Sequence, residues 1–248
     1  PEPEESTVPR IAIIGRPNVG KSTLINTLLG QERNIVTDIA GTTRDSVHTR
    51  YNMFGFDFDL IDTAGLRKKK QIEDQLEFYS TLRTIKSIDE SDVCMLLIDA
   101  DQGFERQDLH VFWQAVGSYR GVVIVVNKWD LIEKDHNTMA EYEAQIRERI
   151  APFTDVPIVF TSNVTKQRII KAFEEALHVY ENRKRHIPTS ELNEFMLPIM
   201  NHQPPPMYKG KMVRIKYVTQ LQSQTPTFAF YCNLPQYVKD PYKRFLEN

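Results

Sequence analysis

An eight-residue stretch near the N-terminus has the residue types and spacing of a phosphate-binding loop. It follows an apolar run at 11–14, matches the pattern GxxxxGK[ST], and reads Gly15-Arg16-Pro17-Asn18-Val19-Gly20-Lys21-Ser22. Glycines let the backbone N–H groups of such a loop wrap around phosphate oxygens, and the positive end of the following helix strengthens the attraction. The lysine can neutralise β and γ oxygens, and the serine hydroxyl can ligate Mg²⁺. We therefore expect this phosphate loop, together with Thr23, to bind nucleotide phosphates.

A second candidate motif follows the apolar run at 58–61 directly and consists of Asp62, Thr63, Ala64, Gly65 and Leu66. We expect Asp62 to hold Mg²⁺ through water and the N–H of Gly65 to meet a γ-phosphate, which makes the loop sensitive to nucleotide state. Between the two motifs, residues 40–45 (AGTTRD) are polar and long enough to fold over the nucleotide. One threonine hydroxyl there could complete the Mg²⁺ shell, and the spacing leaves Thr42 and Thr43 as alternatives.

Residues that could select the base end the apolar run at 122–126 and read Asn127-Lys128-Trp129-Asp130. A carboxylate at Asp130 can accept hydrogen bonds from the N1–H and the 2-amino group of guanine, which adenine lacks. With adenine the partly buried charge would be left without partners. The motif therefore predicts GTP and GDP as ligands and disfavours an ATP-dependent kinase.

The elements that must position these motifs follow from the periodicity of the apolar residues. Apolar, strand-like runs occur at 11–14, 58–61, 93–98, 122–126 and 157–160. Helical three-to-four spacing occurs near 21–29, 74–88, 104–117, 136–149 and 166–181. Fully apolar strands are typical of a sheet covered by helices on both faces, and such sheets bind ligands at the carboxyl ends of their strands. We predict an α/β fold with a doubly wound, mostly parallel sheet, and one antiparallel edge strand within 46–61, where Gly55 would form a hairpin turn.

A smaller α+β region is expected after the basic connector at 181–186 (ENRKRH). The sequence predicts a helix near 189–201, a break at 204–206 (PPP), and strands at 211–220 and 227–233. Residues 1–180 hold 21 Lys and Arg against 28 Asp and Glu, whereas residues 181–248 hold 10 against 5. The basic region is therefore expected to face either nucleic acid or an acidic neighbouring domain.

The composition of the chain, with 41% hydrophobic and 26% charged residues, is typical of a globular protein. No apolar run reaches the ~18 to 20 residues of a membrane span, and the N-terminus lacks the pattern of a signal peptide. We therefore predict a cytoplasmic protein without a membrane partner. Cys94 and Cys232 are expected to be free thiols, and the histidines show no metal-binding spacing.

The motifs GxPNVGKS, GTTRD, DTAGL and NKWD together resemble those of the Der (EngA) family of bacterial GTPases, over residues 10–248. Members of that family carry two tandem GTPase (G) domains and a C-terminal KH-like domain, and they assist assembly of the large ribosomal subunit. The resemblance implies an acidic linker at 1–9 from a missing first G domain, a P-loop GTPase domain at 10–182, and a KH-like domain at 183–248 that is truncated at its C-terminus. It also implies the ribosomal large subunit or its rRNA, and the missing G domain of the same chain, as partners.

The same resemblance refines the candidate site. It favours Thr43 as the Mg²⁺ ligand beside Ser22 and Asp62, and it gives Ser162 and Asn163 as base contacts, although the family usually reads Ser-Ala there. An ordinary KH domain binds nucleotides with a GxxG loop, but Gly210 is the single glycine in 181–248. Basic side chains there could still contact rRNA phosphates without reading sequence, and they are Lys209, Lys211, Arg214 and Lys216.

Hydrolysis would need an unusual source of transition-state stabilisation. Leu66 stands where Ras-like enzymes have a Gln that orients the attacking water. Related GTPases with Asn at the position of Asn18 are similar in using a potassium ion, so we hypothesise slow, K⁺-stimulated hydrolysis with Asn18 as a K⁺ ligand. A turn-forming role of Asn18 is the alternative. The candidate catalytic residues are then Lys21, Asn18, Thr43 and Gly65.

Two functions are compatible with this reading of the sequence. The first is a GTP-hydrolysing switch that acts in assembly of the large ribosomal subunit. The second is a nucleotide-dependent scaffold that binds GTP or GDP with little hydrolysis and docks RNA or protein through its basic C-terminal domain. Leu66 is the residue that keeps the second function open.

Overall fold

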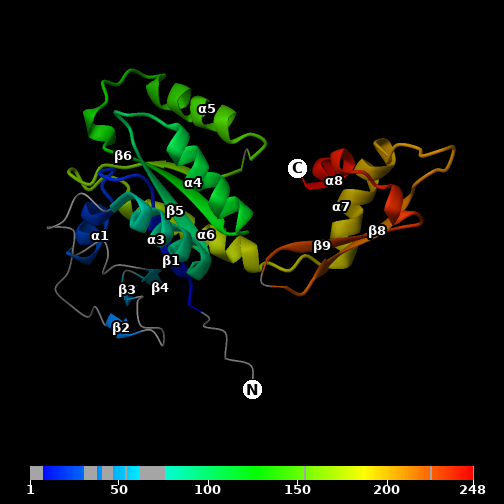
Figure 1. Cartoon of the computed structure of the whole chain (residues 1–248), viewed down its shortest axis with the longest axis horizontal. Coiled ribbons are helices and arrows are strands. Elements are labelled where there is room, and N and C mark those ends of the chain that lie inside the picture. The colour runs from blue at the N-terminus through cyan, green and yellow to red at the C-terminus, as the bar shows by residue number, and fades with distance from the viewer. Residues whose placement is uncertain are drawn as a thin grey trace. The chain divides into compact units, whose positions relative to one another are not determined.

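The computed structural model of the chain describes residues 8–30, 38–40, 47–53, 55–61, 76–153, 155–223 and 225–247. The chain divides into two compact units, Pro1–Tyr180 and Glu181–Asn248 (Figure 1). Within the described ranges, no helix is both long and apolar enough to cross a membrane.

A seven-stranded sheet forms the centre of the first unit, in the order β2-β3-β4-β1-β5-β6-β7. Its strands are β1 (Arg10–Ile14), β2 (Asp38–Ala40), β3 (Val47–Met53), β4 (Phe56–Ile61), β5 (Val93–Asp99), β6 (Gly121–Asn127) and β7 (Ile158–Phe160). The five strands from β4 to β7 in the sheet order pair in parallel. The predicted α/β fold with a mostly parallel sheet is confirmed.

The antiparallel end of the sheet differs from the expectation of a single antiparallel edge strand. β3 pairs antiparallel with β4, and Gly55 lies in the turn between them. However, β3 is not the edge, because β2 pairs antiparallel with its other side. A strand of three residues is too short to produce a readable period, which explains why the sequence did not reveal it.

Helices cover both faces of the sheet because alternate residues of its apolar strands point to opposite sides. They are α1 (Lys21–Leu29), α3 (Leu76–Glu90), α4 (Arg106–Gly117), α5 (Thr138–Ile150) and α6 (Ile169–Lys184) (Figure 1). Ile11 and Ile13 belong to the core that contains α1 and α6, whereas Ala12 and Ile14 belong to the core that contains α3, α4 and α5. This double cover leaves the carboxyl ends of the strands, with their connecting loops, as the place for a ligand.

The second unit packs a helix on a two-stranded antiparallel sheet. Its elements are α7 (Thr189–His202), β8 (Ile215–Leu221), β9 (Thr227–Cys232) and α8 (Asp240–Glu247). Leu192, Met200 and Val218 form its small core. Asn193 of α7 also donates to the carbonyl of Val218 at 2.7 Å and accepts from its N–H at 2.8 Å, so the helix side chain occupies the place of a neighbouring strand.

β8 begins four residues later than the predicted strand at 211–220. Residues 208–211 form a tight turn in which Tyr208 and Lys211 exchange two backbone hydrogen bonds, of 3.1 and 2.9 Å. Lys209 and Gly210 at its centre have φ of 47° and 72°. Lys211 closes this turn instead of beginning a strand, and the pairing with β9 starts only at Ile215.

Candidate nucleotide-binding site

The phosphate loop connects the carboxyl end of β1 to α1 and requires glycine at both ends. Gly15 has φ of 138°, and a Cβ on it would lie 2.3 Å from the carbonyl oxygen of Leu97 in β5. Gly20 has φ of 102°, and a Cβ on it would lie 2.3 Å from Nδ2 of Asn127. Backbone conformation and close packing therefore both exclude side chains, which keeps the loop close to the sheet.

The N-terminus of α1 presents unsatisfied donors. Gly20 precedes the helix, and no side chain among the described residues caps it. The N–H groups of Ser22 and Thr23 donate to no described residue, and neither does the hydroxyl of Ser22. Donors at the positive end of a helix suit a phosphate oxygen, which is the chemistry that the sequence predicts for these residues.

Lys21 extends its ammonium group across the phosphate loop. Its Nζ donates to the carbonyl oxygens of Gly15 at 2.6 Å and of Arg16 at 2.5 Å. Within the loop, Val19 is buried, whereas Pro17 and Asn18 are exposed. The cation is thus held at the loop whose N–H groups would meet the phosphates.

The first base loop, residues 127–130, follows β6 and contains a buried acceptor that fits guanine. Lys128 has φ of 61°, and the short 3-10 helix Trp129–Leu131 follows it. Oδ1 of Asp130 is buried and accepts no hydrogen bond from the described residues. A buried acceptor without a partner costs about 1–3 kcal/mol, and the N1–H and 2-amino donors of guanine would remove that penalty.

Side-chain amides join the base loops to the phosphate loop. Nδ2 of Asn127 donates to the carbonyl of Val19 at 2.8 Å, and Nδ2 of Asn163 donates to the carbonyl of Gly20 at 3.0 Å. The second base loop, residues 161–163, follows β7 and is bonded to the first through Trp129 N–H and the Thr161 carbonyl at 3.0 Å. The structure therefore brings the phosphate loop and the two base loops together.

Ser162 uses its polar groups within its own loop. Its Oγ accepts from the N–H of Thr165 at 3.1 Å, and its N–H donates to the carbonyl of Gln167 at 3.3 Å. The side chain is fully buried. These bonds shape the loop so that the N–H of Asn163, which donates to no described residue, remains available. A base contact by Ser162 itself stays a prediction.

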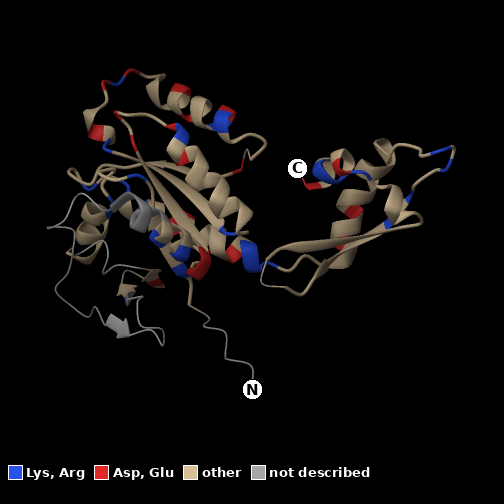
Figure 2. Ribbon diagram, viewed as in Figure 1, with Lys and Arg blue, Asp and Glu red and all other residues tan. Residues whose placement is uncertain are grey.

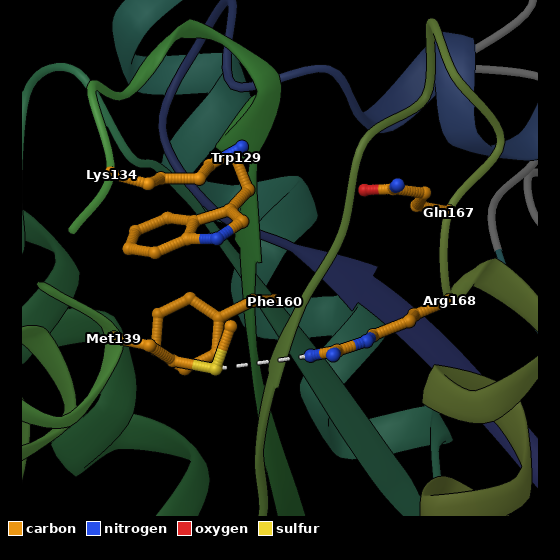
Figure 3. Close-up of a pocket in the computed structure, with 6 residues that line it drawn as sticks. All are labelled: Trp129, Lys134, Met139, Phe160, Gln167 and Arg168. Carbon is orange, nitrogen blue, oxygen red and sulfur yellow. Dashed lines mark hydrogen bonds between the residues drawn. The ribbon is translucent and has the colours of Figure 1, made fainter. Parts of the chain in front are cut away.

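Trp129 anchors the first base loop by packing on two aromatic side chains. Its ring packs 4.5 Å from that of Phe160 and forms an edge contact with Tyr142, while Nζ of Lys134 lies 5.8 Å from its centroid. Figure 3 shows Trp129 and Phe160 beside a cavity of about 320 Å³ whose other lining residues are Lys134, Met139, Gln167 and Arg168. Both rings are about 95% covered, with 5% and 4% exposed, so neither offers a face on which a base could stack.

Asp99 is a member of the site that sequence reasoning missed. It ends β5 opposite Asn127 in the register, and its side chain is 3% exposed. Nζ of Lys128 pairs with its Oδ2 at 2.6 Å, while the N–H of Asp101 donates to its Oδ1 at 3.1 Å. The carboxylate thus fixes the lysine of the first base loop. A signal was available, because the polar residue that ends a buried apolar strand lies at the ligand edge of the sheet.

Arg16 and Asp108 form a second ion pair of the site that the sequence analysis did not predict. Nε of Arg16 donates to Oδ1 of Asp108 in α4 at 2.9 Å, and its guanidinium also reaches Gln102 and the carbonyl of Gly103. Oδ2 of the fully buried Asp108 accepts from the N–H of Glu105 at 3.0 Å. The side chain of Arg16 therefore anchors the phosphate loop to α4.

Replacing Arg16 by Ala should lower the free energy of unfolding by roughly 2 kcal/mol, because it leaves the buried carboxylate of Asp108 without its cation. Burial raises the pKa of Asp108, while the N–H of Glu105 and the guanidinium of Arg16 lower it, so the substitution raises this pKa further. A carboxyl group whose pKa is raised on folding adds stability at pH values below its ordinary pKa of about 4. That contribution is lost as the pH rises through the raised pKa. The loss of stability in the variant should therefore be small below pH about 4 and grow toward neutral pH.

Urea unfolding at several pH values measures this difference. Arg106→Ala is the matched control, since Arg106 is exposed at the start of the same helix. Equal destabilisation by Arg16→Ala at all pH values would contradict the role assigned to the Asp108 carboxylate.

Several predicted site residues lie outside the described residues. They are Thr42, Thr43, Asp62, Thr63, Ala64, Gly65 and Leu66. Of the three predicted Mg²⁺ ligands, the structure describes Ser22.

Both units of the chain match known protein families. The family of 50S ribosome-binding GTPases matches residues 10–128, and the KH-domain-like family of EngA bacterial GTPase enzymes, C-terminal, matches residues 186–248. GTPase Der of Christiangramia forsetii is 58% identical over 247 residues, which cover 100% of this chain and 57% of that protein. The chain belongs to the Der (EngA) GTPase family.

A second relative of the Der family, GTPase Der of Bacteroides thetaiotaomicron, is 57% identical over 246 residues, which cover 98% of this chain and 56% of that protein. The chain thus spans a little over half the length of the curated Der proteins that it matches. Among solved structures, Era in complex with MgGDPNP and nucleotides 1506–1542 of 16S ribosomal RNA has a TM-score of 0.54 at 21% identity. The match covers 97% of this chain and 85% of Era, and it supports the predicted P-loop GTPase fold with a KH-like unit.

Proposed function

We propose that this chain binds GTP and GDP, hydrolyses GTP, and acts as a switch in assembly of the large ribosomal subunit. The observation that carries the proposal is the joining of a donor-rich phosphate loop to a base loop with an unsatisfied buried carboxylate oxygen at Asp130. Membership in the Der family supports the reaction. The scaffold alternative, with little hydrolysis, has no such support.

In the proposed site each part of the chain has one task. Asp130 selects guanine by accepting from N1–H and the 2-amino group, and Asp99 holds Lys128 beside the base loop. The N–H groups at the start of α1 and the ammonium of Lys21 bind phosphate oxygens. Charge that develops on these oxygens in the transition state is stabilised by donors that are already fixed by the fold.

Mg²⁺ fits the hydroxyl of Ser22, which accepts and donates no hydrogen bond among the described residues and lies in the first turn of α1, at its phosphate end. We propose Thr43 and Asp62 as its further ligands and Gly65 as the N–H that meets the γ-phosphate. When bound, Mg²⁺ would neutralise β and γ oxygens. The proposal for these three residues rests on the motifs that contain them.

K⁺ stimulation through Asn18 can be tested because the carboxamide can be removed without changing the turn. Asn18 is exposed and has φ of 64°, a conformation that Asn and Gly tolerate and that Ala does not. Asn18→Gly therefore removes the carboxamide and keeps the turn, whereas Asn18→Ala also strains the backbone. We expect phosphate release by the unsubstituted chain to be several-fold faster in KCl than in NaCl, and Asn18→Gly to abolish that difference.

The outcomes of the salt comparison separate the alternatives. If the Gly variant keeps the full KCl stimulation, Asn18 is a turn-forming residue and the K⁺ hypothesis is wrong. If phosphate release is negligible in both salts while GDP binds, the scaffold function replaces the hydrolytic one. GDP affinity of the Gly variant, measured by titration, is the control for an intact phosphate loop.

For the second unit we propose a KH-like domain at 183–248 that contacts rRNA phosphates, after a G domain at 10–182 and an acidic linker at 1–9. Figure 2 shows Lys and Arg on the segment between α7 and β8 and on α8. Lys209 and Lys239 lie 5.5 and 5.3 Å from the ring of Tyr208, itself stacked on Tyr237. Such a mixture of cations and aromatic rings suits RNA contacts without sequence readout.

The proposed ribosomal role, which requires a cytoplasmic location, is tested with ribosomal particles. Immobilised chain, loaded with a non-hydrolysable GTP analogue or with GDP, is mixed with bacterial ribosomal particles. We expect large-subunit particles to be retained more strongly by the GTP-analogue form. Equal retention by both forms, or retention of small subunits instead, would contradict a GTP-dependent role on the large subunit.

A further inference from the structure

Two carboxamide side chains hold consecutive carbonyl groups of the phosphate loop. Asn127 comes from the end of β6 and binds the carbonyl of Val19 at 2.8 Å, and Asn163 comes from the loop after β7 and binds the carbonyl of Gly20 at 3.0 Å. A Cβ on Gly20 would lie 2.3 Å from Nδ2 of Asn127 and 3.0 Å from Nδ2 of Asn163. Both amides therefore pack directly against the same peptide backbone.

Holding these carbonyls fixes the donors on the other side of the same peptide groups. The carbonyl of Val19 shares a planar unit with the N–H of Gly20, and the carbonyl of Gly20 shares one with the N–H of Lys21. In a trans peptide the C=O and the N–H point in opposite directions. The two amides therefore orient two N–H groups of the phosphate loop away from the base loops. The carbonyl of Gly20 also accepts from the N–H of Leu24 at 2.8 Å, which ties its orientation to the first turn of α1.

The burial of Asn163 indicates that the bond to Gly20 is the reason for an amide here. The side chain is 8% exposed, and its Oδ1 is buried without a hydrogen bond from the described residues. An apolar side chain of similar size would avoid that unsatisfied oxygen. What an apolar side chain could not supply is the donor for the Gly20 carbonyl.

We propose that Asn163 is a positioning residue that couples the base loops to the phosphate loop, so that the contacts made to the base and the contacts made to the β-phosphate depend on one another. The inference rests on the proposed function, because it requires a guanine nucleotide as the ligand. It assigns the side chain of Asn163 to the phosphate loop, and it leaves the N–H of Asn163 to the base.

The test compares two ligands that share the base and differ in the β-phosphate. Affinities for GDP and GMP are measured by calorimetry on the nucleotide-free chain and on Asn163→Ala. Because the oriented N–H groups serve phosphates beyond the first, the variant should bind GDP about tenfold more weakly, the effect of about one hydrogen bond, and GMP no more than about twofold more weakly. Thr165→Ala, an exposed change in the same loop, should alter neither affinity.

Equal losses for GDP and GMP, or no loss for either, would overturn the coupling while leaving the proposed function intact. Failure of the unsubstituted chain to bind GDP would overturn the proposed function, and the coupling with it. Thermal unfolding of each variant shows whether it is folded.

A second variant keeps the test decisive if Asn163→Ala does not fold. Asn163→Asp places a carboxylate against the carbonyl of Gly20, and the acid can donate there only when protonated. Its GDP affinity, relative to that of the unsubstituted chain, should rise as the pH falls. A ratio that is independent of pH would contradict the proposal.

Discussion

Replacing Asp130 by Asn should weaken GDP binding by about 100-fold and strengthen the binding of xanthosine diphosphate. The carboxylate that accepts from N1–H and the 2-amino group becomes an amide whose N–H₂ faces the 2-amino donor. Xanthine carries a carbonyl at that position, so the new amide can donate to it. The substitution should thus exchange the base preference, which a general loss of folding cannot do.

The base exchange is measured by competition of both diphosphates against a fluorescent GDP. Glu133→Gln makes the same carboxylate-to-amide change at an exposed position three residues later and should leave both affinities unaltered. Weakened binding of both diphosphates by Asp130→Asn would mean that Asp130 stabilises the loop without reading the base. Unchanged GDP affinity would show that the Asp130 carboxylate does not bind guanine.

Replacing Lys21 by Ala should weaken GTP binding by about 100-fold, because charge-assisted bonds to phosphate oxygens contribute about 1.5–3 kcal/mol each. The ammonium group now bonds to the carbonyls of Gly15 and Arg16, and its loss also frees these two acceptors at the mouth of the loop. Binding of guanosine, which lacks phosphates, should change little. The variant should therefore lose affinity in proportion to the number of phosphates.

Titrations with guanosine, GDP and GTP measure this dependence on phosphates. Lys171→Ala, which removes an exposed lysine on α6, serves as the control for a loss of charge elsewhere in the unit. If Lys21→Ala binds GTP as tightly as the unsubstituted chain does, the phosphate loop is not the triphosphate site.

The parts of the fold that follow from local pattern were predictable. The apolar runs gave five strands of the sheet, and their assignment to two faces follows from the alternation that places Ile11 in one core and Ala12 in the other. The phosphate loop was predictable because its glycines meet a requirement of backbone conformation that is visible in the sequence. The three-residue strand β2 was not predictable, since it is too short to show a period and is defined only by its pairing with β3.

The hydrogen bonds and ion pairs that join the loops of the site could not be predicted from the sequence, for a different reason. Arg16 and Asp108 are separated by 92 positions, and Asn163 and Gly20 by 143 positions. No periodicity relates such residues, and each pair forms only because the parallel sheet brings the loops after β1, β5 and β7 to one edge. Sequence motifs therefore predict the groups that would meet the ligand, whereas the structure was needed to find the groups that hold them.

The most direct test of a guanine-nucleotide site is a pair of titrations of the nucleotide-free chain, one with GDP and one with ADP, in the presence of Mg²⁺. We expect saturable binding of GDP and an affinity for ADP at least about 100-fold lower, because ADP leaves the Asp130 carboxylate without donors. Comparable affinities for the two, or no heat of binding with GDP at millimolar concentration, would contradict this expectation.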